Sequence, residues 1–177
     1  MTDMRHHGAD SAPSGRGATT LVQRTLCGGL VGAAAVTGLL LGIGRQSGTA
    51  WRPLNAAAHL FIGSSADGVW NFHRSVTPTG GLVVLTMSVV AGFVVACVTA
   101  SRRAPYVMVA AAVVAVVGYL LHVHVAARTP GGLASLLTVG ELRAVYLTLG
   151  VALAVGIRFA FPDPAREPGA SGGVERL

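Results

Sequence analysis

The sequence predicts an all-α polytopic membrane protein with four transmembrane helices and a short re-entrant or interfacial helix in the first outer loop. Only 11% of the 177 residues are charged, and the mean hydropathy is +0.62. A soluble domain carries about a quarter charged residues. Four apolar runs each reach about 20 residues, the length at which a helix crosses the ~30 Å hydrocarbon core. Such a chain has room for one membrane domain, 25–161, and for no second globular domain.

The first span is predicted at 25–44, after a disordered cytoplasmic tail at 1–24 that is polar and without periodicity. A cleaved signal peptide is the competing interpretation, because Arg24 precedes the apolar run. The run is longer than a typical signal-peptide core, and Gly44-Arg45-Gln46 is a poor cleavage site. We therefore expect the span to be retained.

The second and third spans are predicted at 81–100 and 106–127, joined by a tight turn. Pro105 suits the first turn of the third helix, where its missing N–H costs nothing.

The fourth span is predicted at 139–160, because Thr138 and Glu141 have the spacing of a capping box that starts a helix. The residues before it, 133–137, are then a short interfacial segment. A second disordered cytoplasmic tail is predicted at 162–177.

Small residues recur every four positions along these spans, a spacing that lets helices approach closely. They predict packing within the bundle, and also a homo-oligomer or another membrane protein as partner beside the lipid bilayer. The set comprises Gly28, Gly32, Gly38, Gly42, Ser88, Gly92, Ala96, Ala100, Gly150, Ala152, Ala154 and Gly156.

The net charge of +6 does not indicate nucleic-acid binding, because the 13 basic residues, all arginine, are scattered at segment ends. Eight of them fall on the side of the termini and five on the other side. The positive-inside rule therefore predicts a bacterial cytoplasmic (inner) membrane protein with both termini cytoplasmic and the loop 45–80 outside.

That outer loop contains the most informative polar residues. Trp51 suits the headgroup layer, and Pro53 can open a short helix that Gly63 ends. On this helix Asn55 and His59 are four residues apart and share a face.

Metal binding is one interpretation of the outer histidines. The candidate ligands are His59, His73, His122 and Glu141, in one layer with His124 and Asp67. His122 and His124 point about 200° apart on a helix, so only one can face a given ion. Paired haem ligands would lie within the spans, none of which has a central histidine, so we expect no cofactor.

The alternative is that these polar groups are structural. Polar side chains at membrane depth need hydrogen-bond partners, so Asn55 and His59 could hold the loop against the bundle. Glu141 could pair with Arg128, Arg143 or Arg74 and orient the fourth helix. The expected structural polar residues are Asn55, His59, Arg128, Glu141 and Arg143.

Two segments carry a family resemblance, WRPLNAAAHLFIG and ARTPGG. The chain resembles small, uncharacterised bacterial four-helix inner-membrane proteins with a W-x-P-[IL]-N-A-x-x-H-x-x-x-G outer segment and an R-x-T-P-G-like turn. The resemblance covers about residues 20–160, although the turn lacks the intervening residue of that pattern. It supports four spans and singles out Asn55 and His59, but it implies no activity.

No nucleophile–base motif, phosphate loop or CxxC pair occurs, so the sequence favours a non-enzymatic structural or accessory protein. The alternatives are an oligomeric transporter of a small solute or ion and a metal- or haem-binding protein that uses the outer histidines.

Overall fold

The computed structural model describes residues 14–100, 104–125, 128 and 131–160. Four of its helices are long and apolar enough to cross a membrane: α1 (Ser14–Gln46), α4 (Val76–Val98), α5 (Ala104–His124) and α7 (Val139–Phe159). No strand occurs among these residues. The prediction of an all-α polytopic membrane protein is confirmed.

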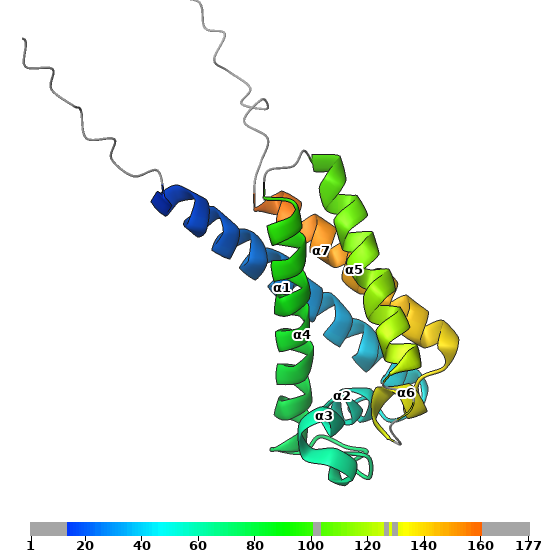
Figure 1. Cartoon of the computed structure of the whole chain (residues 1–177). Helices are drawn as coiled ribbons and strands as arrows, with labels where there is room; N and C mark the ends of the chain where they lie inside the picture. Colours follow the sequence, from blue (N-terminus) through cyan, green and yellow to red (C-terminus); the bar gives the residue numbers. More distant parts are fainter. Residues whose placement is uncertain (1–13, 101–103, 126–127, 129–130, 161–177) are drawn as a thin grey trace, which may run out of the picture.

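The long helices form a bundle in which α1 packs against both α4 and α7, while α5 packs mainly against α7 (Figure 1). Although α4 and α5 are consecutive, they contact each other much less. Four short helices lie at one end of the bundle, α2 (Arg52–Ala57), α3 (His59–Ile62), η1 (Gly63–Ala66) and α6 (Gly132–Leu136). We call it the loop end. The start of α1 and the end of α7 lie at the opposite end of the bundle.

Close contacts between glycines and neighbouring backbones hold α1 against its two partners. A Cβ added to Gly29 would lie 2.7 Å from the Cα of Val89 on α4. One added to Gly156 on α7 would lie 2.7 Å from the carbonyl oxygen of Cys27 on α1. Part of the predicted small-residue pattern is thus used inside the chain, whereas Gly38 and Gly42 have no described atom within 4 Å of that position.

Two apolar clusters make up most of the core. The first joins α1, α2, α4 and α7 near the loop end and includes the fully buried Leu40. The second fills the opposite half between α4, α5 and α7, where Val95 and Leu153 are also fully buried.

Two helices begin earlier than predicted. The predicted tail at 1–24 is wrong for 14–24, because α1 begins at Ser14; residues 18–23 include no proline or glycine that would interrupt the helix. Similarly, α4 begins at Val76 rather than 81, since Pro78 lies in its first turn, where proline is tolerated. The predicted tails at 1–13 and 162–177 lie outside the described residues.

The single short helix expected between Pro53 and Gly63 is divided at Ala58 into α2 and α3, so that Asn55 and His59 lie on different helices. The other elements lie close to their predicted positions. α7 begins at Val139 with the predicted capping box between Thr138 and Glu141, and α6 occupies the expected short segment. α5 ends at His124, three residues before the predicted end of the third span, and residues 126–127 are not described.

Candidate functional site

Asn55 on α2 holds the first loop against the bundle. Pro53 opens this short helix, and Asn55 is completely buried. Its Nδ2 donates to the carbonyl oxygens of Val69 (3.0 Å) and Asn71 (2.9 Å), and its Oδ1 accepts from the Thr77 hydroxyl (2.7 Å). Three bonds satisfy a buried amide that would otherwise be costly. This arrangement is the one expected of a structural residue.

A second polar cluster joins the two loops at the loop end. His59 Nδ1 lies 3.0 Å from both carboxylate oxygens of Asp67, and Asp67 Oδ1 accepts from the backbone N–H of Gly132 (3.1 Å). Gly131 has a φ of +101°, and a Cβ there would collide with the Asp67 carboxylate and the His59 ring. Only glycine fits this position.

Beneath these short helices lies a cavity of about 390 Å³. Ligand sites in proteins range from about 300 to 1,000 Å³, so this volume admits a small molecule. All four long helices contribute to it, and α2 and α6 cover it at the loop end. Its apolar lining includes Val36, Leu40, Leu60, Val83, Val84, Met87, Val114, Leu133, Val145 and Leu149.

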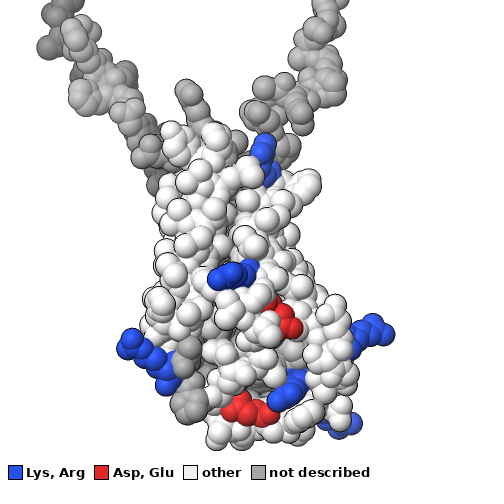
Figure 2. Space-filling view, turned by 90° about the vertical axis from the view of Figure 1, so that its right-hand side faces the viewer, with Lys and Arg blue, Asp and Glu red and all other residues white. Residues whose placement is uncertain are grey.

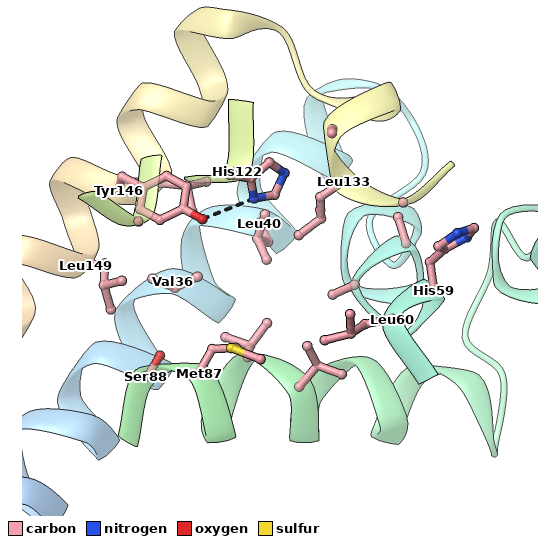
Figure 3. Close-up of a pocket in the computed structure, with 18 of the residues that line it drawn as sticks. Val36, Leu40, His59, Leu60, Met87, Ser88, His122, Leu133, Tyr146 and Leu149 are labelled. Atoms are coloured by element: carbon pink, nitrogen blue, oxygen red, sulfur yellow. Dashed lines mark hydrogen bonds between the residues drawn. The ribbon is translucent and has the colours of Figure 1, made fainter. Parts of the chain in front are cut away.

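The polar groups of this cavity are few. His122 on α5 forms a 3.0 Å hydrogen bond through Nδ1 with the hydroxyl of Tyr146 on α7 (Figure 3). The other ring nitrogen, Nε2, is buried without a hydrogen-bond partner among the described residues. An unsatisfied buried group costs about 1–3 kcal/mol, so a polar atom from a ligand would stabilise this position. Ser88 on α4 adds a hydroxyl, and His59 also lines the cavity at the loop end, with its Nδ1 bonded to Asp67.

The proposed metal ligands are held apart. His59 bonds to Asp67, His73 Nδ1 forms a 3.1 Å hydrogen bond with the Ser75 hydroxyl, and the Glu141 carboxylate bonds to Thr138. His122 faces Tyr146. Within the described ranges, no three histidine, cysteine, aspartate or glutamate side chains gather closely enough to hold a metal ion.

The expected pairing of Glu141 with an arginine is not what the structure shows. Its Oε2 accepts from the backbone N–H (2.7 Å) and hydroxyl (2.8 Å) of Thr138, because a capping carboxylate must turn back toward the helix start. Arg143 Nε instead donates to the Tyr119 hydroxyl (3.3 Å). Arg128 and Arg74 have exposed side chains.

Sequence reasoning missed the two tyrosines, Tyr119 and Tyr146, and the role of Asp67 as the partner of His59. The hydrogen bonds of these three residues join different segments of the chain, and no local sequence pattern reveals such pairs. The sequence did contain one indication of the tyrosines, because a hydroxyl group inside a transmembrane span needs a hydrogen-bond partner.

Comparisons with protein-family models, with curated proteins and with solved structures find no match for the chain.

Proposed function

We propose that the protein is a non-enzymatic accessory protein of the bacterial cytoplasmic membrane that binds a small apolar molecule with one hydrogen-bonding group. The observation that carries this proposal is the cavity of about 390 Å³ with the His122–Tyr146 pair in its wall. An apolar lining disfavours an ionic ligand, because a charge moved there would lose its hydration without compensation.

The ligand enters sideways from the bilayer. Met87 on α4 and Leu60 on α3 line the cavity, yet 51% and 62% of their surfaces are exposed. An opening between α4 and α5 agrees with the slight contact between these helices. A molecule dissolved in the lipid thus reaches the cavity without crossing water.

The alternatives have less support. The second apolar cluster fills the opposite half of the bundle, which argues against a solute pathway through one chain. Asp67 holds both His59 and the backbone of Gly132, so this pair acts as a connection between loops rather than as an acid–base catalyst. The dispersed histidines give no support to a metal centre.

The ligand chemistry is tested with two probes, naphthalene and 1-naphthol, which differ by one hydroxyl. We expect 1-naphthol to bind about fivefold more tightly, since one net hydrogen bond contributes about 1 kcal/mol. His122→Phe should remove this difference, whereas His124→Phe, at an exposed position on the same helix, should keep it. Binding is measured in mild detergent from the concentration dependence of the Tm.

A second pair of variants tests the cavity itself. Ala134 on α6 lines it, while the next residue, Ser135, is exposed. Ala134→Phe should abolish the Tm increase with both probes, and Ser135→Phe should leave it intact. Equal binding to a folded Ala134→Phe protein and to the wild type would place the probes elsewhere and contradict the proposal.

A further inference from the structure

A second apolar groove, of about 450 Å³, runs along α5 and α7 on the outside of the bundle. Small residues such as Ala112 and Gly150 line it, together with the exposed side chains of Met108 and Leu147. Figure 2 shows the side of the molecule on which α5 and α7 lie in Figure 1. Uncharged residues cover most of it, and the charged ones lie mainly toward the loop end.

The length of the groove matches one leaflet of a bilayer. On α7 it extends from Arg143 to Ala154, and on α5 from Met108 to Tyr119. Eleven residues of helix rise about 16 Å, roughly half of a ~30 Å hydrocarbon core. An acyl chain of a single leaflet would therefore fit along it.

One positive charge marks the end of this groove nearer the loop end. Arg143 lines the groove, has an exposed side chain, and donates through Nε to the Tyr119 hydroxyl. Its partner is a neutral phenol, while the nearby Glu141 carboxylate bonds to Thr138. The charge of Arg143 is thus not neutralised by that carboxylate. A long arginine side chain near a helix end extends toward the headgroups.

We propose that the groove binds one acyl chain of an anionic phospholipid from the leaflet at the loop end, with the lipid phosphate on the Arg143 guanidinium. The bond to Tyr119 orients the guanidinium, whose remaining N–H groups can contact phosphate oxygens. This site is separate from the cavity, although Tyr146 lines both.

The test offers the purified protein an equimolar mixture of dioleoyl phosphatidylglycerol and dioleoyl phosphatidylcholine in mild detergent, and counts bound lipids by native mass spectrometry. We expect one retained phosphatidylglycerol. Arg143→Gln should lower the preference for phosphatidylglycerol about fivefold, the factor that one arginine near a membrane surface provides. Arg74→Gln removes the same charge from an exposed loop position and should change nothing.

Two further variants, with one control, separate the effect of the Arg143 charge from the effect of the groove's shape. Tyr119→Phe keeps the charge and should keep most of the lipid preference. Ala112→Leu fills the groove and should lower retention of both lipids, whereas Ala34→Leu, at an exposed position on α1, should not.

Two outcomes would overturn the proposal. The first is that the wild type and Arg143→Gln both retain phosphatidylglycerol and phosphatidylcholine in equal amounts. The second is a wild-type dimer in light scattering that Ala112→Leu converts to a monomer without loss of lipid, which would make the groove an interface between copies.

Discussion

At the scale of single residues, the loop end depends on side chains that each serve more than one partner. Asn55 bonds to three groups from two other segments, and Asp67 bonds to His59 and to Gly132. Loss of one such side chain removes the partner of several buried or part-buried polar groups at once.

We therefore expect Asn55→Ala to lower the free energy of unfolding by about 3 kcal/mol, because two loop carbonyls and the Thr77 hydroxyl lose their partner. The measurement is unfolding by SDS titrated into mild detergent. Asn71→Ala is the matched control: Asn71 takes part through its backbone carbonyl, and its side chain is exposed. A loss of stability in the control as large as in Asn55→Ala would contradict this account.

At the scale of elements, the sequence predicted several helix ends well because a cap or a breaker marks them, although Pro78 did not reveal the start of α4 at Val76. The Thr138–Glu141 capping box placed the start of α7 at Val139, and Pro53 and Gly63 bounded the short helices of the first loop. The start of α1 was missed because the polar residues and the glycines Gly15 and Gly17 around it are typical of a disordered segment.

Helix pairing was not predictable in the same way. α5 is apolar on every side, so its sequence does not indicate which face is buried. On α4 the small residues Ser88, Gly92 and Ala96 do mark the buried face. The hydrogen bond between His122 and Tyr146, 24 residues apart on two spans, depends on that pairing. Asn55 could be singled out from sequence, but its partners could not.

The glycines of α1 and α7 provide a test at this scale. Gly156→Ala would push a methyl group against the backbone of α1, 2.9 Å from the Cα of Gly28, so we expect about 1–3 kcal/mol of destabilisation. Gly42→Ala enters open space and should be neutral, or stabilising by up to about 1 kcal/mol. SDS unfolding measures both, and equal effects would mean that α1 and α7 do not approach as closely as the structure shows.

At the scale of the whole molecule, the two described ends of the chain lie on one side of the bundle and the loops on the other. The eight-to-five distribution of arginines predicts that the side with the ends is cytoplasmic. The cavity and the lipid groove would then both serve the outer leaflet.

Cysteine labelling checks this orientation. In a chain with Cys27 and Cys97 replaced by alanine, we expect Asn71→Cys to react with a membrane-impermeant maleimide in intact spheroplasts. Ala100→Cys, exposed at the opposite end, should react only after permeabilisation. The reverse pattern would invert the orientation.

The slight contact between α4 and α5 has a consequence for biosynthesis. α4 can dock on α1 as soon as both have left the translocon, whereas α5 finds its main partner only when α7 has been made. During that interval α5 has only its slight contact with α4, and the His122 side chain lacks the Tyr146 hydroxyl. Insertion of the last span therefore completes the bundle, and a ribosome stalled before α7 would leave an α5 helix exposed to membrane quality control.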